Sequence, residues 1–162
     1  PMTDETATLA ESHTEMTEIV LPNDTNTHGR ALGGAVLHWM DVCGAIAAMR
    51  FANEEVVTAS MEHVDFKRPI DLGEVVVVEA YVYGTGQSSI EVTVEVRAEN
   101  PQADTEHTTT SSFFTFVAVD DDDEPTAVPD LDCPTDGERR LRDAARDERA
   151  TQLERLAGRV ES

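Results

Sequence analysis

Five stretches of the chain alternate polar and apolar residues or concentrate β-branched ones, as strands with one buried face do. Their ranges are 14–21, 56–66, 74–83, 88–99 and 108–119, with the strictest alternation in 88–99 (SSIEVTVEVRAE). Short segments rich in turn-forming residues, 84–87 (GTGQ) and 100–106, separate the last three. Consecutive strands joined in this way form hairpins, so the pattern predicts an antiparallel sheet.

One long apolar segment, 35–51 (AVLHWMDVCGAIAAMRF), interrupts the strands. It is rich in Ala and Met and nearly free of β-branched clusters, which favours a helix. Because it is apolar around most of its circumference, we expect it to be buried. One curved sheet of this size cannot cover such a helix on all sides, so the uncovered surface should meet a second subunit. A homodimer is the minimum assembly, and the fold class is α+β.

The two ends of the chain differ from this central part. Residues 1–13 are predicted to be a flexible N-terminal arm, 14–121 the folded domain, and 122–162 an acidic linker followed by a C-terminal surface helix. The apolar residues of that helix are spaced among alternating charges: Leu141, Ala145, Leu153 and Leu156. No stretch approaches about 18 consecutive apolar residues, so we expect no transmembrane helix. The acidic start of the chain is unlike a signal peptide.

The charge of the chain adds a further constraint. Lys and Arg number 12 and Asp and Glu 33, giving a formal net charge of −21, yet 40% of residues are hydrophobic, too many for a disordered acidic chain. Such a surface repels nucleic-acid phosphates and anionic lipids, so neither nucleic acid nor membrane is an expected partner. Abundant carboxylates with Lys67 as the only lysine resemble proteins of salt-accumulating halophiles, where salt screens the repulsion. An unusually acidic mesophilic protein is the alternative.

The cysteines and one carboxylate bear on location and chemistry. Cys43 and Cys133 form neither a disulfide framework nor a metal-ligand spacing, so a cytoplasmic protein is expected. Asp41 lies within the apolar helix, and burying an unpaired carboxylate is costly, so it should have a partner or a function. It could serve as a general base. Alternatively, it bonds a loop backbone or lies at a solvated edge.

Gly33 and Gly34 begin the helix with no Ser, Thr, Asp or Asn to cap it, so its first N–H groups lack an evident acceptor. These groups could stabilise an oxyanion at the positive end of the helix dipole; the alternative is a turn that only permits close packing. The preceding loop is rich in residues that form Asx turns, which explains most of them. Its polar members are Asn23, Asp24, Asn26 and His28.

The spacing of Gly34 and Asp41 limits how they can act together. They are seven residues apart, which is about 10 Å along a helix axis. A base and an oxyanion donor that far apart cannot serve the same carbonyl within one chain. Two antiparallel copies of the helix across a dimer would bring the donor of one subunit to the base of the other.

Four longer motifs follow one another along the chain. They are LPNDTNTHGRALGGAVLHWMD at 21–41, VVTASMEHVDFKRPIDLGEVV at 56–76, YGTGQSSIEVTVEV at 83–96 and FFTFVAVD at 113–120. In order and spacing this set resembles the hotdog-fold acyl-CoA thioesterases of the YciA and brain acyl-CoA hydrolase type, over about residues 12–121. The resemblance implies the hotdog fold, a long central helix wrapped by an antiparallel sheet. It also implies dimers that commonly assemble into trimers of dimers, hence a homohexamer.

The resemblance further implies an acyl-CoA thioester hydrolase of lipid metabolism, with Asp41 as general base or nucleophile. It assigns Asn26 to the attacking water or the carbonyl, and the backbone of Gly33 and Gly34 to the thioester. The coenzyme A (CoA) contacts that it implies are Lys67 and Arg68 near the phosphates, and Gly86, Ser88 and Ser89 along the groove. No metal or separate cofactor is implied, since CoA is part of the substrate and its thiolate leaves readily.

The chain departs from the family pattern at two places. Relatives often carry His after the helix-end Arg, where this chain has Arg50 and Phe51, and the acidic tail of 43 residues is poorly matched. The pair Lys67 and Arg68 also has another interpretation, which is that it balances the neighbouring carboxylates of Asp65 and Asp71.

Two other functions are weighed against hydrolysis. A hotdog enoyl-CoA hydratase would carry a D-x-N-P-x-H loop, but the segment 24–28 (DTNTH) has no Pro and its His arrives one place early. A non-catalytic acyl-CoA-binding regulator would need a basic helix-turn-helix segment, and the sequence has none. Both are therefore disfavoured.

Overall fold

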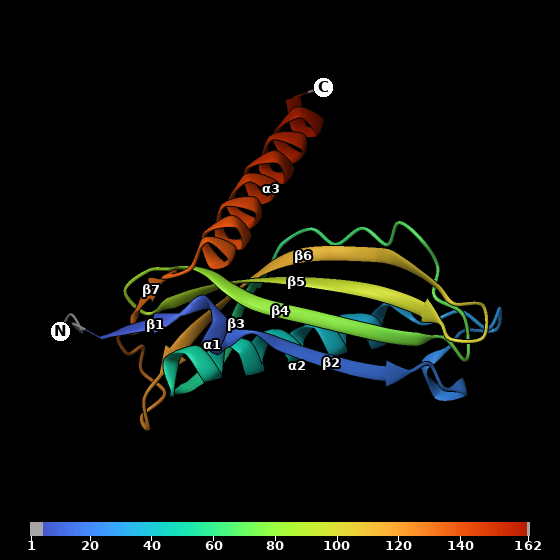
Figure 1. The fold of residues 1–162 in the computed structure, drawn as a ribbon, viewed down its shortest axis with the longest axis horizontal. Helices are drawn as coiled ribbons and strands as arrows, with labels where there is room; N and C mark the ends of the chain where they lie inside the picture. The colour runs from blue at the N-terminus through green and yellow to red at the C-terminus, as the bar shows by residue number, and fades with distance from the viewer. Residues whose placement is uncertain (1–4, 162) are drawn as a thin grey trace.

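Five strands form one antiparallel sheet, and residues 5–161 are those that the computed structural model describes. The strands are β2 (Thr14–Ile19), β3 (Glu55–Met61), β4 (Val75–Thr85), β5 (Ser89–Asn100) and β6 (Thr105–Val119). They lie in the order β2-β4-β5-β6-β3, and every neighbouring pair is antiparallel. Figure 1 shows the helix α2 (Gly33–Ala52) running along one face of this sheet. The predicted α+β arrangement of one long helix against an antiparallel sheet is confirmed.

An apolar core joins α2 to the sheet. The helix residues that face the sheet recur every three or four positions, as one face of a helix requires. Those that are at most 2% exposed include Val36, Met40, Cys43, Ala47 and Phe51. Gly44 packs closely against β6, because a Cβ there would be 3.1 Å from the ring of Phe116. The small residue therefore permits a close approach of helix and sheet.

The opposite side of α2 is not covered by this chain. Met49 on the helix is 40% exposed, and Val57 and Met61 of the edge strand β3 are 50% and 44% exposed. Helix α2 is long and apolar enough to cross a membrane by length and composition alone. Half of that apolar window is buried inside the fold, as in the core helix of a globular protein.

The prediction of a flexible arm over residues 1–13 is wrong for residues 6–12, while residues 1–4 lie outside the described part. Strand β1 (Thr6–Thr8) pairs in parallel with β7 (Asp130–Asp132), and the short helix α1 (Leu9–Ser12) follows. The reason is apolar burial, since Ala7 is 6% and Leu9 only 1% exposed. The segment 125–134, expected to be a plain linker, therefore contains a strand that holds the start of the chain.

The strand predicted over 56–66 ends earlier, at Met61. Beyond it the segment 62–67 still follows β6, through isolated hydrogen bonds rather than a continuous ladder. The Glu62 N–H donates to the Phe113 carbonyl at 2.9 Å, and the Lys67 N–H to the Thr109 carbonyl at 3.0 Å. This segment therefore keeps a fixed position beside the sheet although it is not a strand.

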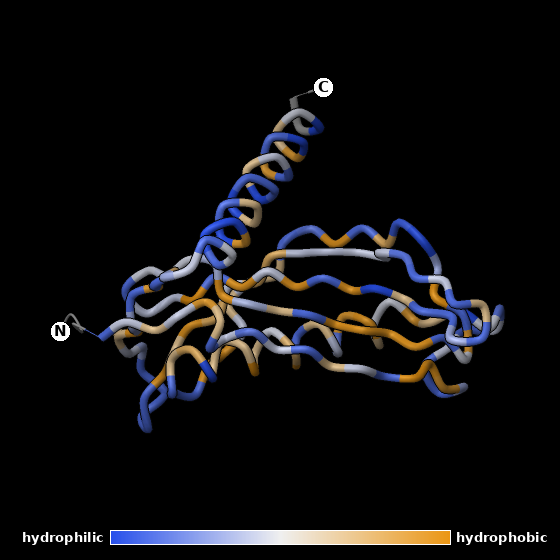
Figure 2. The backbone as a smooth tube through the Cα atoms, viewed as in Figure 1, coloured by the Kyte–Doolittle hydropathy of each residue, from blue (hydrophilic) through white to orange (hydrophobic). Residues whose placement is uncertain are grey.

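The C-terminal helix α3 (Asp136–Glu161) lies where the sequence predicts a surface helix. Figure 2 shows that it is mostly hydrophilic. Its Ala145 is 3% exposed and packs with Tyr83 and Phe113 on the sheet face opposite α2. Arg149 binds the carboxylates of Glu62 and Glu91, each at 2.9 Å. These contacts hold α3 against the outer face of the sheet.

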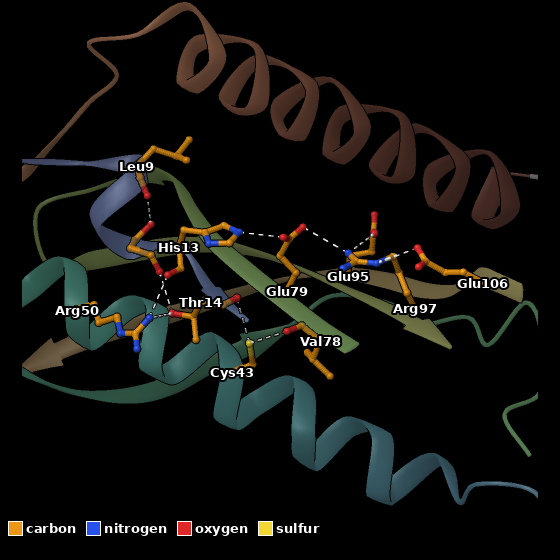
Figure 3. Close-up of polar contacts among 11 residues, drawn as sticks. Leu9, His13, Thr14, Cys43, Arg50, Val78, Glu79, Glu95, Arg97 and Glu106 are labelled. Carbon is orange, nitrogen blue, oxygen red and sulfur yellow. Dashed lines mark hydrogen bonds and ion pairs between the residues drawn. The ribbon is translucent and has the colours of Figure 1, made fainter. Parts of the chain in front are cut away.

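A network of ion pairs lies under α3 on the same face (Figure 3). Arg97 contacts carboxylate oxygens of Glu79, Glu95 and Glu106 at 3.5, 3.2 and 3.3 Å. One guanidinium thus neutralises part of a group of three acids on neighbouring strands. Arginines are few in this chain. An arginine that is bound by acids of the same chain, as Arg97 is, leaves little positive charge for a ligand, so the pairing of each arginine is informative.

Candidate functional site

Asp41 lies halfway along α2, on the side of the helix that borders the edge strand β3. Its side chain is partly buried, and the Thr58 hydroxyl donates to its Oδ1 at 2.8 Å. The β3–β6 register shifts between Thr58 and Ser60, and such bulges re-aim strand side chains. Asp41 therefore lies at a partly solvated edge with a side-chain partner. Thr58 was not among the site residues predicted from sequence, because a threonine in a strand carries no distinguishing signal.

Asn26 organises the loop before α2. Its Oδ1 accepts hydrogen bonds from the backbone N–H of His28 at 2.9 Å and of Arg30 at 3.2 Å. The Asx-turn interpretation of this loop is therefore correct for Asn26. Because the oxygen is occupied by the turn, the side-chain amide is left to face outward as a hydrogen-bond donor, and the residue is exposed.

The start of α2 has the open N-terminus that the sequence predicts. Leu32 occupies the N-cap position, and no side chain caps the helix. Gly33 and Gly34 are both exposed, and a Cβ on Gly34 would meet no atom within 4 Å. A Cβ on Gly33 would lie 3.5 Å from the ring of Phe66. In the described residues neither N–H group donates a hydrogen bond, so both are available to an oxyanion.

The residues predicted to contact CoA fall into two groups at opposite ends of the sheet. Lys67 bonds to Thr109 near the start of β6, whereas Ser89 pairs with Val117 near its end. These two β6 positions are eight residues apart, about 26 Å along a strand. The structure brings Lys67 and Arg68 to the end of the sheet where α2 begins. One protomer does not bring them together with Gly86, Ser88 and Ser89.

Lys67 and Arg68 were also considered as partners of nearby acids. Within the described residues neither forms an ion pair, and the Asp65 carboxylate instead contacts His63 Nε2 at 2.8 Å. Lys67 lines a small cavity beside α3, and Arg68 lines a separate one at the β5–β6 turn. The two adjacent bases therefore serve different surfaces.

Other reactive side chains are less suited to chemistry. Burial raises the pKa of the Cys43 thiol to about 12, and its Sγ lies 3.5 Å from the Val78 carbonyl. Figure 3 shows this thiol pointing from α2 toward the sheet, and Cys43 is fully buried there. Among residues 5–161 no group of three His, Cys, Asp or Glu side chains could hold a metal ion. Asp41 with Thr58 is the arrangement best suited to attack an electrophile.

Comparisons with known proteins show the family of the chain. The family model described as the thioesterase superfamily matches residues 28–105. The acyl-CoA thioester hydrolase YkhA of Bacillus subtilis is 38% identical over 143 residues, which are 88% of this chain and 83% of that protein. The acyl-CoA thioester hydrolase YciA of Escherichia coli K12 is 33% identical over 114 residues, 68% of this chain and 86% of that protein. The predicted resemblance is thereby confirmed at the level of the family.

Solved structures extend the likeness to the whole fold. A hexameric acyl-CoA thioesterase, in its apo form, matches with a TM-score of 0.83 and 38% identity over 94% of this chain and 98% of its own. The acyl-CoA hydrolase of Staphylococcus aureus was solved with butyryl-CoA and CoA. It matches with a TM-score of 0.79 and 34% identity, over 94% of this chain and 99% of its own. These coverages include most of the C-terminal tail, so the expectation that the tail is poorly matched is wrong.

The S. aureus hydrolase has also been solved as three alanine variants, of one Asp, one Thr and one Asn. In its chain the Asn precedes the Asp by 15 residues and the Thr follows the Asp by 17. Asn26, Asp41 and Thr58 have the same spacing here.

Proposed function

The chain belongs to the acyl-CoA thioester hydrolases of the thioesterase superfamily, and from this premise we propose that it cleaves acyl-CoA to CoA and a carboxylic acid at a site containing Asp41. The observation that carries the assignment is the hydrogen bond of 2.8 Å between Thr58 and Asp41. It fixes one carboxylate oxygen and leaves the other for chemistry. The equal Asn–Asp–Thr spacing in the S. aureus hydrolase supports the choice of these residues.

The reaction needs a nucleophile, an oxyanion site and a leaving group. A carboxylate can take a proton from water as the water oxygen attacks the thioester carbon, or it can attack that carbon itself to form a mixed anhydride that water then hydrolyses. The exposed N–H groups of Gly33 and Gly34 are the donors for the oxyanion. As the C–S bond breaks, the CoA thiolate leaves and takes up the proton. The outward amide of Asn26 is placed to bind the water or the carbonyl.

Because Gly34 and Asp41 are about 10 Å apart along one helix, the complete site requires two protomers. In a dimer with antiparallel α2 helices, the start of one helix lies beside the middle of the other. Such a dimer also brings the end of one sheet, with Lys67, beside the opposite end of its partner, with Ser88 and Ser89. The exposed apolar side of α2 and the open edge of β3 supply a surface for it. The hexameric relative supports three such dimers as the full assembly.

We further propose that the protein works in the cytoplasm of a halophile. The net charge of −21 on 162 residues supports this. In molar salt the Debye length is about 3 Å, so repulsion between separated surface carboxylates is largely removed. The dimer and its shared site should therefore depend on salt.

Thiol release from a chain-length series of acyl-CoAs in molar KCl tests the function. We expect hydrolysis with a preference for one range of acyl lengths. Hydration of crotonyl-CoA without thiol release would instead identify a hydratase. Tight binding of acyl-CoA with no thiol release would identify a non-catalytic acyl-CoA-binding protein.

A single-turnover reaction in ¹⁸O-labelled water separates the two roles of Asp41. A general base places the label directly in the released acid. A nucleophilic carboxylate forms a mixed anhydride, and when water attacks its Asp41 carbonyl the first turnover releases an unlabelled acid and places the label in the Asp41 side chain. Label in Asp41, which peptide mass spectrometry detects, therefore identifies nucleophilic attack.

A further inference from the structure

A small cavity lies between α3 and the segment 62–67, outside the site described above. Its volume is about 70 Å³, several times what one water molecule needs. It therefore has room for a small anion such as a phosphate group. Polar and basic side chains dominate its lining: His63, Lys67, Ser111, Gln152, Arg155 and Arg159.

The charge of this cavity is the reverse of that of the chain. Only 12 of 162 residues are Lys or Arg, yet the single lysine and two arginines line this one space. Asp65 is the only carboxylate in the lining, and it is engaged by His63 at 2.8 Å. Lys67 and Arg155 form no ion pair with any carboxylate of the described residues.

A comparison along α3 shows that this is not a general property of the helix. Arg149 lies less than two turns before Arg155 and is bound by Glu62 and Glu91 at 2.9 Å each. Arg155 lines the cavity together with Lys67 and forms no such ion pair among the described residues. Two cations that line one cavity without a carboxylate partner favour a bound anion, and guanidinium groups bind phosphate oxygens in a bidentate manner.

The position of Lys67 links this cavity to the proposed active site. The preceding residue, Phe66, lies with its ring 3.5 Å from where a Cβ on Gly33 would be. Neighbouring side chains of an extended segment point to opposite faces. Phe66 therefore lies beside the start of α2, and the next residue, Lys67, lines the cavity under α3.

We propose that α3 completes a phosphate site with Lys67, and that Arg155 binds a phosphate group of the CoA part of the substrate. This inference rests on the proposed function and adds α3 to the residues that recognise the substrate. It also gives the C-terminal helix a role in a protein whose long-range field repels CoA. The attraction is supplied locally, by Lys67 and Arg155, which form no ion pair with a carboxylate of the described residues.

Arg155→Gln tests the proposal, with Arg146→Gln as the matched control, since Arg146 is exposed on the same helix and does not line the cavity. We expect Arg155→Gln to raise KM for acyl-CoA about tenfold with kcat unchanged, the pattern of lost uniform binding. Hydrolysis of the corresponding S-acyl pantetheine, which lacks the nucleotide, should not change. Arg146→Gln should behave as the wild type in both assays.

Calorimetric binding of adenosine 3′,5′-bisphosphate gives a readout that does not need catalysis. We expect about tenfold weaker binding to Arg155→Gln than to the wild type and to Arg146→Gln. Equal KM and equal binding in the two variants would overturn the phosphate site while leaving the hydrolase intact. Wild-type protein that binds the bisphosphate but releases no thiol would instead overturn the proposed function. Equal losses with acyl-CoA and S-acyl pantetheine would show that Arg155 is structural.

Discussion

The hydroxyl of Thr58 donates a hydrogen bond of 2.8 Å to Oδ1 of Asp41. It joins the edge strand β3 to the middle of α2. A carboxylate held by one oxygen keeps one orientation, and its second oxygen stays available to a ligand. Thr58, which carries no obvious signal in the sequence, thus fixes the orientation of Asp41, the most conspicuous residue of the helix.

Replacing Thr58 should affect catalysis more than folding. Thr58→Val keeps the shape but removes the hydroxyl, and we expect kcat to fall about tenfold, since a hydrogen bond to a charged group contributes about 1.5–3 kcal/mol. Thr58→Ser should restore most of the rate. Steady-state kinetics measure this, with the melting temperature as the control because Thr58 is exposed. Equal rates for the Val and Ser variants would show that the bond does not position the carboxylate.

Asp41→Asn should abolish turnover without disturbing the fold. The amide has nearly the same shape and can still accept the Thr58 hydrogen bond, but it cannot take a proton or attack a carbonyl. Loss of a general base typically lowers the rate by about 10²–10⁴. Thiol release measures the rate, and gel filtration in molar KCl checks the assembly. Hydrolysis at near the wild-type rate would refute the assignment of Asp41.

Much of the fold follows from local patterns. Alternation identifies the long strands, because one face of each strand is buried. The apolar composition of 35–51 identifies α2, because the helix was expected to be buried on nearly all sides. Asp41 is conspicuous as a carboxylate among apolar residues. The three-residue pairing of β1 with β7 has no such signature, because it joins segments more than 120 residues apart. The separation of Lys67 from Ser89 likewise depends on strand order, which periodicity does not determine.

Gly34→Ala separates the two explanations for the paired glycines. The helix has room for a Cβ at this position, and Ala in a helix is more favourable than Gly by about 0.5–1 kcal/mol. We therefore expect an unchanged or slightly higher melting temperature together with a clear loss of kcat, because the methyl group occupies the space beside the oxyanion donors. A drop in melting temperature with activity retained would instead indicate that the glycine serves packing alone.

Neither cysteine should react in the folded protein. Burial raises the pKa of Cys43 to about 12 and also raises that of Cys133, so at pH 8 both are neutral thiols, whereas the thiolate is the reactive form. Both side chains are buried. Titration with Ellman's reagent should detect no protein thiol until denaturant is added and then detect two. A thiol that reacts quickly in native conditions would contradict the packing of α2 or of the segment after β7.

Salt should control assembly, and activity should follow assembly. Each chain carries a net charge of −21, and the Debye length grows from about 3 Å in 1 M salt to about 30 Å in 0.01 M salt. In dilute buffer, charges on paired protomers therefore repel one another across the whole interface. We expect analytical ultracentrifugation to show an oligomer in 2 M KCl and smaller species in 20 mM KCl, with thiol release lost over the same range.

A variant with fewer charges distinguishes screening from a specific need for potassium. Asp121, Asp122 and Asp123 are exposed, and their side chains form no hydrogen bond that the structure shows, whereas Asp120 caps the turn and should be kept. Asn tolerates the left-handed backbone at position 123, where φ is 60°. Replacing all three by Asn removes three negative charges without altering the fold. If repulsion limits assembly, this variant must assemble and regain activity at lower KCl than the wild type; an unchanged midpoint would mean that bound potassium, not screening, is required.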